Sequence, residues 1–319
     1  MKQRRLGRTN LQVSEIGMGC WAIGGSGYGP TNDTESLQTL QTAWDSGVNF
    51  FDTADTYGQG HSETLVAQFL QNKSRDQIIL ASKAGWDFYQ EGGARKNFDP
   101  KYLTFACEES LKRLKTDYID IYQLHNPIPD LIEKGEAVSA LEKLREQGKI
   151  RFIGISIHTE RDALACFADE RVDTLQLIFH YLDQRMAQKV FPLAKEKDRG
   201  IIVREPLACG LLTGKYTSAD HIFHKEDHRR RWTREKLELE LQKVETMKKV
   251  LVTSRNSMVR ASLEYILQFE EVGTVIPGAK TPSQLLENIQ ASKEPMLRSQ
   301  EAFLLRRLYQ QEPVFQKFL

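Results

Sequence analysis

Several features that define other classes of protein are missing from this sequence. Its four cysteines, Cys20, Cys107, Cys166 and Cys209, form no CxxC pair, so reduced thiols in a cytoplasmic protein are expected. No apolar run approaches the roughly 18 residues that a membrane-spanning helix needs, and no apolar segment follows the basic N-terminus as in a signal peptide. Charge excess is missing too: 44 Lys and Arg face 43 Asp and Glu, a net charge of +1. No overall field therefore favours nucleic acid or a membrane as a partner.

What the sequence does contain is a regular alternation of apolar runs and helix-period segments. Several of the runs are continuous, which is typical of strands buried on both faces of a parallel sheet. The intervening segments carry helix-start signals, such as the N-cap Asp99-Pro100 and the capping box Thr281-Pro282-Ser283-Gln284. The predicted strands are residues 16–20, 48–51, 78–82, 118–124, 152–155, 174–179, 201–204 and 273–276.

Eight strand–helix repeats with no break in composition predict an α/β fold, a (β/α)8 TIM barrel that forms a single domain over residues 1–319. An open doubly wound sheet is the alternative, and the repeat count favours the barrel. The Gly17–Ala22 stretch fits G-x-G-x-x-A, but residues 23–27 do not continue as a helix, so the fingerprint typical of the open sheet fails.

Three segments lie outside the plain repeat. Residues 3–13, with a turn at 7–10, predict an N-terminal β-hairpin that plugs the N-terminal end of the barrel. Residues 215–255, with a charged helix at 235–251, are too long for a simple connection, and residues 300–319 add a helix and an apolar tail. Long loops at the C-terminal face of a barrel are where lids and substrate contacts are placed.

Four polar residues are predicted at the ends of successive strands. Asp52 ends the second strand, Tyr57 lies on the loop after it, Lys83 ends the third and His125 the fourth. Taken singly, such residues are usually a turn former, a packing ring, a solvated lysine and a structural histidine. In a barrel, however, these strand ends converge on one pocket, and the four types together make a proton relay.

Each member of this relay has a physical role. The Lys83 cation favours the phenolate of Tyr57 and lowers a pKa that is ordinarily near 10. Asp52 can pair with Lys83 and prevent a lone buried cation, and His125 can hydrogen-bond a carbonyl oxygen. The group is predicted to protonate an oxyanion as it forms, for which hydride delivery to a carbonyl carbon is the natural partner reaction.

The run Phe51-Asp52-Thr53-Ala54-Asp55-Thr56-Tyr57-Gly58 resembles the signature of the aldo-keto reductases. The resemblance continues in order over nearly the whole chain, through Ala81-Ser82-Lys83, Leu124-His125, Gly154-Ile155-Ser156, residues 206–215 and residues 276–279. It implies a (β/α)8 barrel that binds NADPH in extended form and reduces aldehydes and ketones. It makes Tyr57 the proton donor, supported by Lys83 and Asp52, with His125 orienting the substrate oxygen.

The same resemblance implies a set of residues that bind NADPH, with NADH the less favoured cofactor. Ser156 and Gln176 would hold the nicotinamide carboxamide, residues 207–215 would wrap the pyrophosphate, and residues 278–288 would bind the adenosine end. The helix start at 281–284, with Lys280, would attract a 2′-phosphate. The full set is Trp21, Ser156, Gln176, Arg204, Pro206, Leu207, Gly210, Leu211, Lys215, Gly278, Lys280, Gln284, Glu287 and Asn288.

The chain departs from the family pattern at three places. Ile157 follows Ser156 where the family usually has an asparagine, so a carboxamide contact is missing from its usual position. Arg204 stands where many members stack a tyrosine on the nicotinamide, and an arginine plane can also stack. Gly278-Ala279 replaces the Lys-Ser pair of some members, which leaves phosphate recognition to Lys280 and Gln284.

The expected partner is a small-molecule carbonyl substrate. Trp21, Tyr28, Trp86, Phe88 and Tyr89 lie in loops at the barrel mouth and can form either packing or an apolar substrate pocket. His221, His224 and His228 show helical spacing, but their highly charged segment holds no cysteine, and no metal site is expected. The alternative to an enzyme is a regulatory or redox-sensing subunit that resembles the cofactor-binding β subunits of potassium channels. The oligomeric state is left open.

Overall fold

The core of the fold is an eight-stranded parallel sheet. The structure, a computed structural model, describes residues 1–25, 27–251, 257–293 and 297–317. Neighbouring strands pair in parallel along the whole sheet. In spatial order the strands are β3 (Met18–Gly19), β4 (Phe50–Asp52), β5 (Ile79–Ala84), β8 (Ile119–His125), β9 (Ile150–Ser156), β10 (Thr174–Ile178), β11 (Gly200–Arg204) and β12 (Val272–Val275).

The two edges of this sheet meet and close it into a barrel. Parallel bridges join Ile16 to Val275 and Gly19 to Gly278, and the Gly17 amide donates to the Val275 carbonyl across 2.8 Å. The (β/α)8 prediction is confirmed and the open doubly wound alternative is wrong. The first strand is shorter than predicted: Met18 and Gly19 form a ladder with β4, and the contact with the last strand segment consists of the two isolated bridges.

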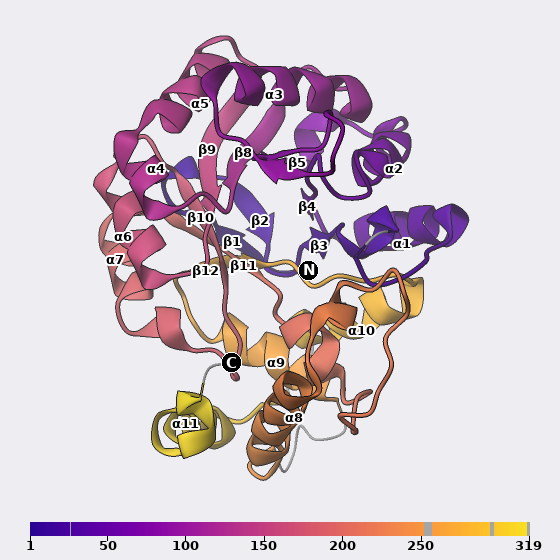
Figure 1. Ribbon diagram of the computed structural model, residues 1–319, viewed down its shortest axis with the longest axis vertical. Coiled ribbons are helices and arrows are strands. Elements are labelled where there is room, and N and C mark those ends of the chain that lie inside the picture. Colours follow the sequence, from indigo (N-terminus) through magenta and orange to yellow (C-terminus); the bar gives the residue numbers. More distant parts are fainter. Residues whose placement is uncertain (26, 252–256, 294–296, 318–319) are drawn as a thin grey trace.

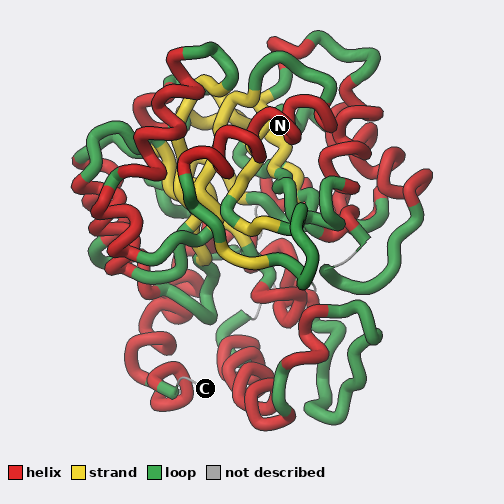
Figure 2. The backbone as a smooth tube through the Cα atoms, turned by 45° about the horizontal axis from the view of Figure 1, so that its top comes forward, coloured by secondary structure: helices red, strands yellow, loops and turns green. Residues whose placement is uncertain are grey.

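Helices surround the strands as the repeat predicts (Figure 1). The Asp99 carboxylate accepts the backbone N–H of Lys101 at 2.8 Å, so the predicted N-cap begins a helix. Two helices depart from the ring and lie together at one side of the molecule (Figures 1 and 2): α8 (Arg234–Lys248) and α11 (Ser299–Gln311). The remaining helices are α1 (Asp33–Asp45), α2 (His61–Leu70), α3 (Pro100–Leu114), α4 (Pro129–Lys134), α5 (Glu136–Glu146), α6 (Glu160–Ala168), α7 (Val190–Glu196), α9 (Met258–Leu267) and α10 (Pro282–Lys293).

The N-terminal hairpin plugs the barrel as predicted. Strand β1 (Gln3–Arg5) pairs antiparallel with β2 (Gln12–Ser14), and the fully buried Leu6 enters the space beside Gly200 and Gly273. A Cβ atom added at either glycine would come within 2.7 Å of the Leu6 side chain, so both positions need glycine. Leu6 packs into an apolar cluster inside the barrel, towards its N-terminal end: Leu6, Val13, Phe50, Ile79, Ala81, Ile121, Ile202 and Ile276.

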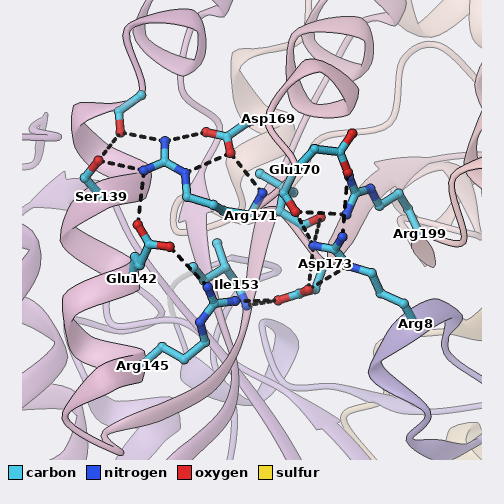
Figure 3. Close-up of polar contacts among 12 residues, drawn as sticks. Arg8, Ser139, Glu142, Arg145, Ile153, Asp169, Glu170, Arg171, Asp173 and Arg199 are labelled. Atoms are coloured by element: carbon cyan, nitrogen blue, oxygen red, sulfur yellow. Dashed lines mark hydrogen bonds and ion pairs between the residues drawn. The ribbon is translucent and has the colours of Figure 1, made fainter.

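Carboxylates and arginines tie the strands together at the N-terminal end of the barrel (Figure 3). Asp173, just before β10, accepts the Ile153 amide of β9 at 2.9 Å and the Arg8 guanidinium at 2.8 Å. Arg145 reaches the same carboxylate at 3.5 Å. Each carboxylate oxygen is thereby satisfied by charge-assisted or backbone donors, which fixes the register of the strand starts. This end of the barrel serves stability rather than chemistry.

The long connections lie at the other end. A small antiparallel hairpin, β6 (Trp86–Asp87) and β7 (Arg95–Lys96), follows β5, and residues 205–233 follow β11 before α8. The prediction of long loops at the C-terminal face is confirmed, although residues 252–256 of the predicted 215–255 segment, and 318–319 of the tail, lie outside the described residues. None of the described helices has the length and apolarity needed to cross a membrane.

Candidate active site

A cavity of about 820 Å³ opens at the C-terminal ends of the strands. Of the four relay residues, Asp52, Tyr57 and His125 line it, and Lys83 is buried directly beneath. Most of the predicted cofactor residues also line it, namely Trp21, Gln176, Arg204, Pro206, Leu207, Gly210, Lys215, Gly278, Lys280, Gln284, Glu287 and Asn288. Ser156 and Leu211 do not line the cavity. The fold therefore gathers residues from nearly 270 positions of sequence into one continuous space.

Asp52 is the hub of the polar layer above the apolar plug. Its Oδ1 accepts the Lys83 ammonium at 2.6 Å, and its Oδ2 accepts the side-chain amides of Gln176 at 2.7 Å and Gln123 at 3.2 Å. All four side chains are buried. One cation and two amides thus compensate a carboxylate that would be costly to bury alone.

Lys83 uses each of its three N–H donors. Besides Asp52, the ammonium donates to the Thr53 carbonyl at 2.8 Å and to the Tyr57 phenolic oxygen at 3.2 Å. Burial alone would lower the pKa of Lys83, but Asp52 and Tyr57 outweigh it and the pKa is raised. The side chain is therefore a fixed, fully hydrogen-bonded cation with one donor aimed at the phenol.

Tyr57 forms part of the cavity wall and keeps its proton. Burial raises the pKa of Tyr57, while the nearby Lys83 cation lowers it, and burial prevails. Lys83 lowers the pKa of Tyr57 as predicted, but desolvation is the larger effect and the net shift is upward. The phenol consequently stays protonated near neutral pH, so it has a proton to donate.

His125 is held in its neutral form. Its ring lies 5.9 Å from that of Tyr57 in an edge-to-face arrangement. Burial, followed by the Lys83 and Arg204 cations, moves the pKa of His125 well below its ordinary value. Nδ1 has no hydrogen-bond partner among the described residues. A neutral imidazole beside the phenol can donate a hydrogen bond to a bound carbonyl oxygen, or accept one from a bound hydroxyl, without adding charge.

Two residues of the polar layer escaped the sequence reasoning. Gln123 stands two residues before His125 on β8, so the period of a strand places both side chains on the inner face, and that spacing was the available signal. Asn126 follows β8 with a left-handed φ of 60° and lines the cavity. Its Oδ1 accepts the Ser156 hydroxyl at 2.8 Å, and only the fold brings those two strand ends together.

Arg204, at the end of β11, is fixed beside the nicotinamide position that the resemblance implies. Its guanidinium pairs with Glu205 and donates to the Ile157 carbonyl at 3.2 Å. It also lies 3.0 Å from Nδ1 of His158, whose pKa burial and Arg204 lower to about 4. The planar cation is thus held at the cavity wall with much of its charge compensated by a carboxylate.

The other end of the cavity differs from what the sequence predicted. The Lys280 ammonium donates to three backbone carbonyls, those of Tyr28 at 2.7 Å and of Gly29 and Pro30 at 3.2 Å. All three donors are used, and burial lowers the pKa of Lys280. Lys280 therefore anchors the loop after β3 instead of offering a free cation to a phosphate.

The helix start beside Lys280 is also internally bonded. Thr281 Oγ1 accepts the backbone N–H of Gln284 at 3.2 Å, as the capping box predicts. The side-chain oxygen of Gln284, Oε1, accepts the backbone N–H of Lys280 at 2.9 Å. Asn288 Nδ2 lies 3.4 Å from the Gly278 carbonyl. The exposed side chains of Lys215, Arg231 and Glu287 also bring charge to the cavity.

The loop after β3 also joins the loop after β11 across the cavity. Tyr28 and Asp227 form an antiparallel bridge, and the His228 amide donates to the Gly27 carbonyl at 3.0 Å. The Trp21, Tyr28 and His228 rings contact one another, and Trp21 stacks on Tyr57 at 6.0 Å. Trp21, Tyr28 and Trp86 give the space near Tyr57 aromatic walls. His228 is thus used in packing rather than on a helix face shared with His221 and His224, which lie in an irregular segment.

Known proteins are similar to this chain in sequence and in fold. The family model described as "Aldo/keto reductase family" matches residues 15–309. The uncharacterized oxidoreductase YqkF of Bacillus subtilis is 36% identical over 306 residues, covering 94% of each chain. The NADH-specific methylglyoxal reductase of Escherichia coli is 30% identical and covers 97% of this chain and 98% of its own. A Klebsiella pneumoniae aldo/keto reductase, solved with NADP and acetate, superposes with a TM-score of 0.71 at 25% identity, covering 97% of this chain and 95% of its own.

Proposed function

The chain belongs to the aldo/keto reductase family, and on that premise we propose that it reduces the carbonyl group of an aldehyde or ketone with NADPH, using Tyr57 as the proton donor. One observation carries the proposal: the Lys83 ammonium lies within hydrogen-bonding distance of both Asp52 and the Tyr57 phenol at the floor of the cavity. A buried lysine that donates to a cavity-lining phenol is the arrangement expected of a proton relay.

The residues present fit a nicotinamide dinucleotide. The cavity volume lies in the upper part of the roughly 300–1,000 Å³ typical of ligand sites. Gln176 lines it with a buried Oε1 that has no partner among the described residues, an acceptor suited to an amide N–H. Lys215 and Arg231 bring exposed cations to a space that would receive phosphates.

The chemistry divides between the cofactor and this chain. When bound, the nicotinamide supplies the hydride that adds to a carbonyl carbon. Tyr57 gives its proton to the carbonyl oxygen as negative charge develops there, and Lys83, 3.2 Å away, stabilises the phenolate left behind. Asp52 holds Lys83 in position, and neutral His125 orients the substrate oxygen by a hydrogen bond.

Aromatic walls favour a small carbonyl compound with an apolar or planar portion. Trp21 and Trp86 line the cavity together with His125 and Tyr57, so apolar rings lie in the same wall as the polar groups that would bind a carbonyl oxygen. An aldehyde or unhindered ketone fits this division of polar and apolar surface.

For the cofactor we favour NADPH with a small margin over NADH. The Klebsiella relative was solved with NADP, whereas the Escherichia coli relative is named for NADH. In this chain Lys280, the cation next to the adenosine end, is committed to backbone carbonyls. The remaining exposed cations, Lys215 and Arg231, favour an additional phosphate without a dedicated cradle.

Turnover by the purified chain tests this function. A panel of aldehydes and ketones, each with NADPH and with NADH, is followed by the loss of nicotinamide absorbance. We expect carbonyl-dependent oxidation of NADPH at an ordinary enzymatic rate, on the order of 1 s⁻¹ or more. Cofactor binding without turnover of any carbonyl in the panel would instead support the regulatory-subunit alternative.

A further inference from the structure

Gln176 has an amide whose orientation is set by its neighbour. Its Nε2 donates to Asp52 Oδ2 at 2.7 Å, and a carboxylate paired with a lysine only accepts hydrogen bonds. Oε1 must therefore face the other way. That oxygen is buried, has no partner among the described residues, and belongs to a residue that lines the cavity. The inner wall thus presents one unsatisfied acceptor to any ligand above it.

Asn126 presents the opposite half of an amide. Its Oδ1 accepts the Ser156 hydroxyl at 2.8 Å, so Nδ2 is the free end of the side chain, and no described residue accepts from it. Asn126 is half-buried and lines the cavity next to His125. The wall therefore also presents a pair of N–H donors.

The backbone places these two groups at matched positions. His125 on β8 is in register with Ser156 on β9, and Ser156 is in register with Gln176 on β10. The backbone N–H of Asn126 donates to the Ser156 carbonyl at 3.1 Å, which continues the same ladder by one residue. Asn126, the donor, follows β8, and Gln176, the acceptor, lies on β10, with Ser156 on the strand between them. Because neighbouring strands are roughly 4.8 Å apart, the two flanking strands are about 10 Å apart.

Ser156 and Ile157 cannot supply the contact that Asn126 offers. Ser156 is fully buried and does not line the cavity, and its hydroxyl donates a hydrogen bond to Asn126. Ile157 is also fully buried, packed in the apolar core. The polar contact expected at 156–157 is thereby transferred to the end of the preceding strand.

We propose that Asn126 binds the carbonyl oxygen of the nicotinamide carboxamide and supplies the amide donor that is absent at Ile157, while Gln176 Oε1 accepts from the carboxamide NH2. A primary carboxamide carries one strong acceptor and two donors, so it complements the free Nδ2 and Oε1 atoms. The pair fixes which way the ring faces the substrate. This inference rests on the proposed function, since it requires a nicotinamide ring in the cavity.

A purely conformational role for Asn126 makes a different prediction. Its φ of 60° lies in the left-handed region, which asparagine and glycine tolerate better than other residues. Asn126→Gly preserves that backbone preference and removes the side-chain amide. If the backbone alone matters, the glycine variant will bind the cofactor as the native chain does.

The experiment measures dissociation constants by calorimetry for NADP⁺, for its 3-acetylpyridine analogue and for 2′,5′-ADP, which has no nicotinamide half. Asn126→Gly should weaken NADP⁺ roughly 3- to 10-fold, the value of one hydrogen bond, and leave 2′,5′-ADP unchanged. The acetylpyridine analogue keeps the carbonyl but lacks the NH2, so the glycine substitution should weaken it by a similar factor. Asn126→Asp, which replaces the donor with a carboxylate oxygen, should weaken NADP⁺ at least as much.

Each outcome bears on the proposal. Native-like NADP⁺ binding by Asn126→Gly, or an equal loss for 2′,5′-ADP, would overturn it while leaving the reductase function intact. A native chain that binds neither NADP⁺ nor 2′,5′-ADP would contradict the proposed function and this inference together.

Discussion

The fully buried Lys83 ammonium donates a hydrogen bond to the phenolic oxygen of Tyr57 across 3.2 Å. This contact joins two opposing effects. Burial raises the pKa of Tyr57 and keeps the phenol protonated, while the cation lowers the cost of the phenolate that forms when the proton leaves. A proton donor needs both an acid that keeps its proton at rest and a conjugate base that is stabilised once the proton has left.

Replacing Lys83 by Met should slow carbonyl reduction by about 10²- to 10⁴-fold, because the phenolate loses its stabilising charge. The same change leaves Asp52 unpaired inside the barrel and should lower the free energy of unfolding by about 3–5 kcal/mol. The double variant Asp52→Asn, Lys83→Met is the matched control, since it removes both charges. Steady-state kcat and urea unfolding are measured for both variants. Recovery of kcat in the double variant would show that Lys83 acts only through stability.

Acid should destabilise the fold through His125. The folded pKa is depressed by burial and by Lys83 and Arg204, whereas the unfolded chain titrates near 6.5. Below about pH 6.5 the unfolded chain binds a proton that the folded chain excludes, so the free energy of unfolding falls as the pH falls. The limiting slope for one such residue is about 1.4 kcal/mol per pH unit.

Comparing the native chain with His125→Asn isolates this contribution. Buried Asp55 has a raised pKa and acts in the opposite sense, since its stability contribution is lost as the pH rises. Asp55 is common to both proteins and cancels in the difference. Urea unfolding at several values between pH 5 and 7 should give the variant the flatter dependence. Parallel curves would be inconsistent with a neutral buried His125.

Lys280→Met should weaken NADP⁺ and NAD⁺ by similar factors. The ammonium is bonded to the carbonyls of Tyr28, Gly29 and Pro30, so its loss loosens the loop after β3, which serves both cofactors equally. Dissociation constants for the two cofactors are measured by calorimetry on the native chain and the variant. A loss for NADP⁺ more than about tenfold greater than for NAD⁺ would show a direct phosphate contact and refute this assignment.

Substitutions at the N-terminal end of the barrel should lower stability and leave cofactor binding unchanged. Asp173→Asn removes the charge that binds Arg8 and Arg145 and should cost about 2–4 kcal/mol of unfolding free energy, since Asp173 is buried. Asp198→Asn is the matched control. Its pair with Arg5 is about half exposed, and asparagine suits its φ of 50°. That change should cost less than about 1 kcal/mol. Equal costs, or altered NADP⁺ affinity in Asp173→Asn, would argue against this division between the two ends.

Strand ends were predictable because their signals are local. Continuous apolar runs ended close to Asp52, Lys83 and His125, and the geometry of a barrel then required those ends to converge. The N-caps at Asp99 and Thr281 were readable for the same reason, since a cap bonds within four residues of itself.

Contacts between segments that lie far apart in the chain could not be predicted from the sequence. Lys280 reaches carbonyls some 250 positions away, and nothing near it reveals that its charge is already used. Asn126 shows its role only when β8 and β9 lie side by side. The pKa of Tyr57 depends on how deeply the ring is buried, which pairwise reasoning about Lys83 does not supply.

A comparison of Tyr57→Phe with the native chain is the sharpest test of Tyr57 as the proton donor. The substitution removes one oxygen, the atom to which Lys83 donates, and keeps the ring that stacks on Trp21. We expect carbonyl reduction to fall at least about 10²-fold while the dissociation constant for NADP⁺ stays within roughly threefold of the native value. Native-like kcat in Tyr57→Phe would contradict the account, because the proton would then have to come from another group.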